Sequence, residues 1–258
     1  MSEITKYLES YFSLEGVRAA GTGGSRASGM GDENSDYDIY IFTDRVPEPE
    51  ERLKLVKRLS GRYEIYGDYF GPGDEFLVDE INREFDLMYF DAGDFEKHVK
   101  SVWLECRASN AYTTCFLYTL KNLRIEYDPE GFIAELKRII DTPYPEGLRE
   151  NIIKRTFMLM KDKPFSSYLE QIEKALERKD LNSISHRRSA FMESYFDALF
   201  AINRLLHPGE KRLISYALEN CSALPEDFEE DMKKALNCNG SELPGILSGM
   251  AEKLRKII

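Results

Sequence analysis

The chain has 258 residues, of which 42% are hydrophobic and 31% are charged, so it can bury a substantial core. No apolar run approaches the roughly 18 residues of a membrane span, and the N-terminus lacks a signal layout. We therefore expect a cytoplasmic protein with no membrane partner. Its cysteines lack CxxC spacing, which indicates reduced thiols and no disulfide framework or zinc site: Cys106, Cys115, Cys221 and Cys238.

The net charge of −11 belongs entirely to the N-terminal half. Residues 1–130 contain 26 acidic and 15 basic side chains, whereas residues 131–258 contain 20 of each. Phosphate contacts supply most of the affinity of nucleic-acid-binding proteins, so this charge argues against a nucleic-acid partner. The same charge would attract metal ions or cationic small molecules.

Residues 1–130 predict a mixture of helices and strands. The expected helices, which follow apolar spacing and capping signals, cover residues 4–12, 47–62 and 94–106, the last with Asp94 as its N-cap. Strands are expected where β-branched and aromatic residues cluster, at residues 14–20, 36–42, 63–69, 75–79, 83–91 and 123–131. Residues 21–35 are rich in Gly, Ser and Asn and predict a loop.

Beyond residue 131 the pattern becomes helical throughout. Apolar residues recur at i, i+3 and i+4, and Gly and Pro separate about five to seven such segments. The expected fold class is α+β, with a mixed-sheet head over residues 1–130 and an all-helical C-terminal bundle over residues 131–258.

Asp36 and Asp38 are the first residues with evident chemistry. They are two apart on an expected strand, so both carboxylates project to the same face. Such close carboxylates repel each other unless a cation lies between them, and oxygen ligands of this kind suit Mg²⁺.

A glycine-rich turn lies upstream of this strand. Gly23 and Gly24 let backbone N–H groups approach a phosphate, and the Ser25 hydroxyl and Arg26 guanidinium add further donors. The turn is not a Walker A loop, because no Gly-Lys-Ser/Thr follows at the required spacing.

The order Gly24-Ser25, ten residues, then Asp36-Tyr37-Asp38-Ile39 resembles the signature of the DNA polymerase beta-like nucleotidyltransferase superfamily. In that family a third carboxylate, flanked by hydrophobic residues, lies on a later strand, and Phe85-Asp86-Leu87 matches this pattern. The helical tail resembles that of bacterial small-molecule nucleotidyltransferases of the aminoglycoside and lincosamide type.

This resemblance implies a Mg²⁺-dependent enzyme that moves a nucleoside monophosphate, with AMP from ATP favoured, onto a hydroxyl of a small molecule. Asp36 and Asp38 would hold the metal, and Asp86 would either complete the metal site or take the proton from the hydroxyl. A tail cation would reach the nucleotide phosphates, and Lys211 is the residue we expect. The acidic head favours a cationic acceptor such as an aminoglycoside-like antibiotic.

Three alternatives remain open. The acceptor could be a protein hydroxyl, because the motif does not specify it. The head could also bind a nucleotide without turnover, or serve as an antitoxin-type interaction module. The three carboxylates and the fused helical tail favour an enzyme.

A group of five further acids is either a recognition surface for a cation or a solvated rim: Asp68, Asp74, Glu75, Asp79 and Glu80.

Overall fold

A computed structural model describes residues 4–27, 35–67 and 71–258 of the chain, without the side chains of residues 25, 27 and 66. It contains two compact units. The first consists of Met1–Lys100 and Thr119–Thr142, and the second of Ser101–Tyr118 and Pro143–Ile258. The chain therefore crosses between the units three times, in contrast to the single division expected at residue 130.

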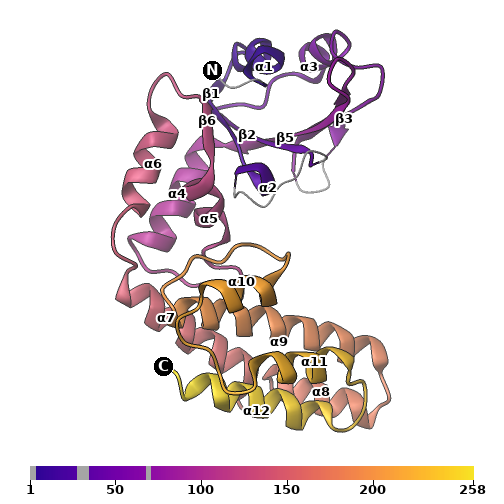
Figure 1. The fold of residues 1–258 in the computed structure, drawn as a ribbon, viewed down its shortest axis with the longest axis vertical. Coiled ribbons are helices and arrows are strands. Elements are labelled where there is room, and N and C mark those ends of the chain that lie inside the picture. Colours follow the sequence, from indigo (N-terminus) through magenta and orange to yellow (C-terminus); the bar gives the residue numbers. More distant parts are fainter. Residues whose placement is uncertain (1–3, 28–34, 68–70) are drawn as a thin grey trace. The chain divides into compact units, whose positions relative to one another are not determined.

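A mixed sheet of six strands forms the centre of the first unit (Figure 1). In spatial order it is β3-β4-β5-β2-β1-β6; β2 and β5 are parallel and the other neighbours are antiparallel. The strands are β1 (Val17–Thr22), β2 (Tyr37–Thr43), β3 (Tyr63–Gly67), β4 (Gly73–Val78), β5 (Arg83–Asp91) and β6 (Arg124–Tyr127). With the helices that follow, this sheet confirms the predicted α+β class.

The two faces of the sheet have different coverings. On one face, Ile39 and Ile41 of β2 are buried in a cluster with residues of α1 (Thr5–Phe12) and α3 (Pro49–Val56). On the opposite face, Phe42 contacts rings of two further helices, Phe95 of α4 (Ala92–Trp103) and Phe132 of α6 (Phe132–Ile140). The contact with Phe132 explains why α6 groups with the sheet and not with the C-terminal helices.

Two local predictions were wrong. The helix expected to start at Asp94 begins at Ala92, because the Asp91 carboxylate accepts a hydrogen bond from the Asp94 backbone N–H at 2.7 Å and so caps it. Both aspartates fit an N-cap, and the Ala-Gly pair between them gave no reason to choose the earlier one. Within the expected loop, Gly24–Ala27 form the short helix α2, and residues 28–34 lie outside the described residues.

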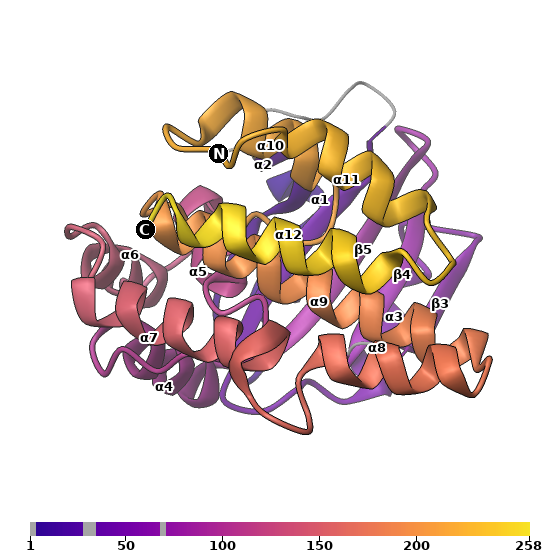
Figure 2. The ribbon, with the colours of Figure 1, turned by 90° about the horizontal axis from the view of Figure 1, so that it is seen from below.

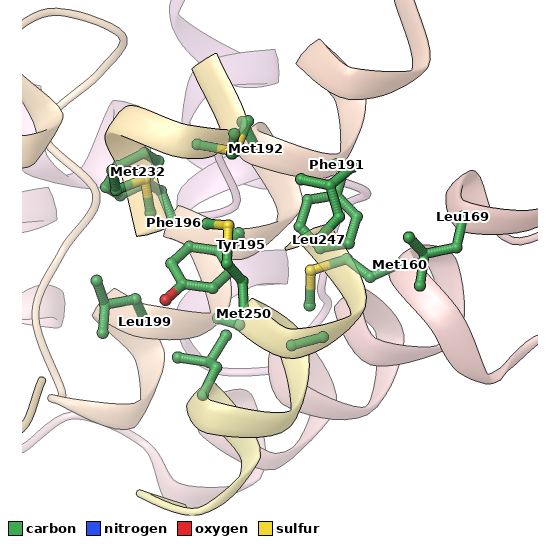
Figure 3. Packing of buried hydrophobic residues seen from close by; sticks show 14 of the residues in the cluster. Met160, Leu169, Phe191, Met192, Tyr195, Phe196, Leu199, Met232, Leu247 and Met250 are labelled. Carbon is green, nitrogen blue, oxygen red and sulfur yellow. The ribbon is translucent and has the colours of Figure 1, made fainter. Parts of the chain in front are cut away.

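The second unit is helical in the part of the chain that the structure describes. Its long central helix, α9, packs against α7 and α8 (Figure 2). Side chains of α9, including Phe191 and Tyr195, share a buried cluster with Leu247 and Met250 of α12 (Figure 3). The helices are α5 (Cys115–Asn122, divided between the units), α7 (Glu146–Phe157), η1 (Met158–Asp162, a π-helix), α8 (Tyr168–Glu177), α9 (Leu181–Ile202), α10 (Leu213–Asn220), α11 (Phe228–Asn237) and α12 (Leu243–Arg255).

No helix in the described ranges combines the length and apolarity that crossing a bilayer requires.

A buried ion pair joins α3 to β4 in the first unit. The Arg52 guanidinium donates to the Asp74 carboxylate, and both side chains are almost fully shielded, at 4% and 0% exposed. The Tyr89 hydroxyl donates to the other Asp74 oxygen at 2.8 Å. Asp74 therefore belongs to the core, and its expected place in an exposed acidic rim was wrong.

We predict that Asp74→Ala lowers the free energy of unfolding by about 3–5 kcal/mol, because it leaves the Arg52 charge buried without its carboxylate. Urea denaturation of the purified chain measures this change. Glu80→Ala is the control, because Glu80 pairs with Lys6 at the exposed surface, and its denaturation midpoint should not move. A loss for Asp74→Ala below about 1 kcal/mol would contradict the prediction.

Candidate active site

Asp38 and Asp86 lie side by side on the two parallel strands of the sheet. They are register partners in the β2–β5 ladder, and Asp36 directly precedes β2. Because side chains alternate along a strand, Asp36 and Asp38 share the face that carries Asp86. The same face carries Phe42 and Phe90 four residues further on, where α4 and α6 cover it. The carboxylates thus occupy the end of this face that precedes the aromatic covering.

The electrostatics of Asp86 reflect this crowding. Burial, followed by the negative charges of Glu75, Asp38 and Asp36, raises the pKa of Asp86 from 3.8 to about 6. The pKa shift follows from the same geometry, in which all four carboxyl groups act on one small region. It also indicates a place where a positive charge would be stabilised.

A row of acids extends from this region across four strands. Glu64 of β3 pairs in register with Glu75 of β4, and Glu75 pairs with Asp86. The sequence assigned Glu75 to a group of acids that was either a recognition surface for a cation or a solvated rim, and it gave Glu64 no role. The β3–β4 hairpin register was the signal that could have found Glu64, because this pairing brings the two acids opposite each other.

A cavity of about 300 Å³ opens beside this row. Five acids, one arginine and an apolar and aromatic wall line it: Asp36, Glu64, Glu75, Glu84, Asp86, Arg62, Tyr63, Phe76, Leu77 and Phe85. The cavity lies entirely within the first unit. A small cationic group fits such a lining in charge.

The glycine-rich turn contacts Asp38 through Gly23 and Gly24. The Gly23 N–H donates to the Asp38 carbonyl at 2.8 Å, and Gly24 has a φ of +64°. A Cβ at Gly24 would fall on the Asp38 carboxylate, so that residue has both a steric and a conformational reason to be glycine. The contact to Asp38 was not part of the expected phosphate-binding role of Gly23 and Gly24. The Ser25 side chain lies outside the described part of the structure.

Arg26 is directed toward backbone carbonyls. Its Nε donates to the Ser35 carbonyl at 2.8 Å and to the Asp36 carbonyl at 3.1 Å, and its Nη2 donates to the Ser35 carbonyl at 2.5 Å. The guanidinium also lies 4.1 Å from the centre of the Tyr37 ring. These contacts differ from the phosphate contact that the sequence suggested.

The carboxylates suit a divalent cation in donor type and charge. Within the described ranges, no three His, Cys, Asp or Glu side chains form a ready-made metal site. However, oxygen donors from a rigid sheet match the preference of Mg²⁺. The raised pKa of Asp86 shows negative charge that a cation would offset.

Lys211 belongs to the second unit, on the loop between α9 and α10. Its side chain is exposed, whereas His207 in the middle of the loop is fully buried. The His207 N–H donates to Thr114 Oγ1 at 2.8 Å, its Nδ1 accepts from the Gly209 N–H at 3.2 Å, and burial lowers the pKa of His207 to about 4. His207 is therefore a neutral packing residue that anchors the loop.

Comparison with known proteins identifies the class of the N-terminal domain. Residues 1–109 match the family model described as nucleotidyltransferase domain. This match confirms the resemblance predicted from the Gly-Ser and Asp-x-Asp pattern, and the three carboxylates lie within the matched residues. Over residues 1–109 the chain is thus similar to a nucleotidyltransferase domain.

Two solved structures are similar along nearly the whole chain. The nucleotidyltransferase-like protein from Exiguobacterium sibiricum 255-15 is 8% identical with a TM-score of 0.46, over 98% of this chain and 72% of its own. The spectinomycin adenyltransferase AAD(9) from Enterococcus faecialis, solved with ATP and spectinomycin, is 12% identical with a TM-score of 0.33, over 98% of this chain and 96% of its own. No curated protein matches the chain.

We predict that Asp86→Asn stabilises the fold at about pH 8 and not at about pH 4. The folded chain holds the Asp86 proton more tightly than the unfolded chain, so ionisation costs stability as pH rises from about 4 through 6, and the cost is complete above 6. The gain at high pH should be about 1–2 kcal/mol, since Asp86 is only partly buried. Urea denaturation in EDTA at both pH values measures it. An equal effect at the two values would contradict the assigned electrostatics.

Proposed function

We propose that the chain transfers a nucleoside monophosphate from a nucleoside triphosphate, ATP in the first instance, to a hydroxyl group of a small molecule. One observation carries the proposal. Asp38 and Asp86 oppose each other on parallel strands beside Asp36, inside residues that match the nucleotidyltransferase domain model. The acid-lined cavity beside these residues and the raised pKa of Asp86 support the proposal.

In this reaction the acceptor oxygen bonds to the α-phosphorus, the bond to pyrophosphate breaks, and the hydroxyl proton passes to a base. Asp36, Asp38 and Asp86 would hold Mg²⁺, which when bound neutralises charge on the triphosphate. The chain's own part is positioning, because strands β2 and β5 hold Asp38 and Asp86 on a rigid sheet. Gly24 would bring its backbone N–H close to the phosphates, whereas the Gly23 N–H already donates to the Asp38 carbonyl. Ser25 and Lys211 are further candidates for nucleotide contact, and the Arg26 guanidinium donates to backbone carbonyls instead.

The negative charge of the cavity lining indicates the class of acceptor. Glu64, Glu75 and Glu84 add to the negative lining that Asp36 and Asp86 give the cavity. We therefore propose a cationic acceptor, with aminoglycoside-like antibiotics as the first compounds to test.

Incubation with α-labelled ATP, GTP, CTP or UTP, Mg²⁺ and an antibiotic panel tests the proposal directly. Label on a small-molecule product supports it. Label on added protein would indicate a protein hydroxyl as the acceptor. Tight nucleotide binding with no transfer under any condition would indicate a binding module and overturn the enzymatic assignment.

We predict that Asp38→Asn lowers turnover by several powers of ten, because it removes one charge that holds the metal and triphosphate. The fold should be intact, since the change keeps the size of the side chain and relieves repulsion. Asp44→Asn, the same change just beyond the other end of β2, is the matched control and should keep full activity. Near-normal turnover by Asp38→Asn would exclude the assigned site.

Asp86→Asn distinguishes a base from a metal ligand. If Asp86 is the base, turnover should fall by about 10²–10⁴-fold while the affinity for MgATP changes little. If it is mainly a metal ligand, both quantities should fall. Calorimetric titration with MgATP, combined with initial rates, measures the two effects. Unchanged rate and affinity would exclude Asp86 from either role and direct attention to Glu75, its register partner.

A further inference from the structure

The three aspartates differ in how their backbones are held. Asp38 and Asp86 face each other inside the β2–β5 ladder, so neighbouring strands fix both positions. Asp36 precedes that ladder, whose first pair is Tyr37 with Phe85. Because Asp36 lies before the paired part of the strand, its carboxylate needs another contact if its orientation is to be fixed as firmly as those of Asp38 and Asp86.

Arg26 supplies that contact. Three hydrogen bonds run from its guanidinium to the carbonyls of Ser35 and Asp36, at 2.8, 2.5 and 3.1 Å. The Gly23 N–H bond to the Asp38 carbonyl lies on the same short segment. Gly23, just before α2, and Arg26, within α2, thus attach this segment to Asp38 and to the residues just ahead of it.

The guanidinium packs on an aromatic side chain that contacts the core. Its Cζ lies over the Tyr37 ring, 4.1 Å from the centroid, and the Tyr37 ring lies 4.8 Å from that of Phe85, which is 1% exposed. Stacking on an aromatic ring while donating from a planar fork is a combination that arginine offers and lysine does not. The Arg26 Nε and Nη2 groups that donate to these carbonyls do not point toward a phosphate.

We propose that Arg26 is a positioning residue, which fixes the backbone of Asp36 so that its carboxylate stays beside Asp38. This inference rests on the proposed function for its effect on turnover, but its effect on metal affinity can be measured without nucleotide. It assigns Arg26 a role different from the phosphate contact expected from the glycine-rich turn.

The test uses Mn²⁺ binding to the full chain, followed by electron paramagnetic resonance without nucleotide, and steady-state kinetics. Four proteins are compared: wild type, Arg26→Lys, Asp36→Asn and the double variant. Arg26→Lys keeps the charge but loses the fork and the stack. We expect it to weaken Mn²⁺ binding at least about fivefold and to lower kcat about 10–100-fold, with the nucleotide KM changed less than about threefold.

The double variant gives the decisive comparison. If Arg26 acts through Asp36, adding Arg26→Lys to Asp36→Asn should weaken Mn²⁺ binding no further. Additive losses would overturn the proposal, as would normal Mn²⁺ binding by Arg26→Lys. A raised nucleotide KM with unchanged kcat and Mn²⁺ affinity would instead make Arg26 a phosphate ligand.

Two controls separate this inference from the proposed function and from unfolding. Arg138→Lys makes the same substitution at an exposed pair with Glu135 in the same unit, and should match wild type. Thermal melting checks that each variant is folded. If wild type transfers no nucleotide, the proposed function fails, whereas the Mn²⁺ comparison still decides whether Arg26 positions Asp36.

Discussion

The parallel pairing of β2 with β5 is the constraint on which the candidate site depends. It places Asp38 opposite Asp86, although 47 positions of sequence lie between them, and the adjacent antiparallel strand adds Glu75. Like charges this close oppose folding, so the pairing must be held by something other than the carboxylates. The apolar residues of the opposite face, such as Ile39 and Leu87, provide that stabilisation because they are fully buried.

The sheet thus divides stability and chemistry between its faces. Alternation along β2 and β5 assigns apolar side chains to the core with α1 and α3, and acidic side chains to the other face. Further along that face, Phe42 and Phe90 are covered by aromatic contacts with α4. One strand can therefore hold charged groups at its start and still be anchored at its end.

Much of this arrangement could be predicted from the sequence. The strands at 36–42 and 83–91 and the Asp-x-Asp spacing follow from local patterns, whereas the third aspartate followed from the family resemblance, which the domain match supports. The residues that were missed depend on pairing between distant segments. Glu64 joins the acid row only through a hairpin register, and α6 joins the sheet only through Phe132. Asp74 and Glu75 look alike in sequence, yet one is buried and the other lines a cavity.

The opposite environments of Asp74 and Glu75 help to fix the alignment of β4 with β5. Asp74 and Glu75 are adjacent on β4, so they point to opposite faces. A slip of β4 by one residue against β5 would move Glu75 into the core opposite Arg52 and bring Asp74 to the cavity, and would turn Phe76 and Val78 out of the core. This alternative is disfavoured because it would break the Arg52–Asp74 ion pair and the hydrogen bond from the Tyr89 hydroxyl to the same carboxylate. The buried pair therefore selects one alignment of the strands, and with it the set of acids that faces the cavity.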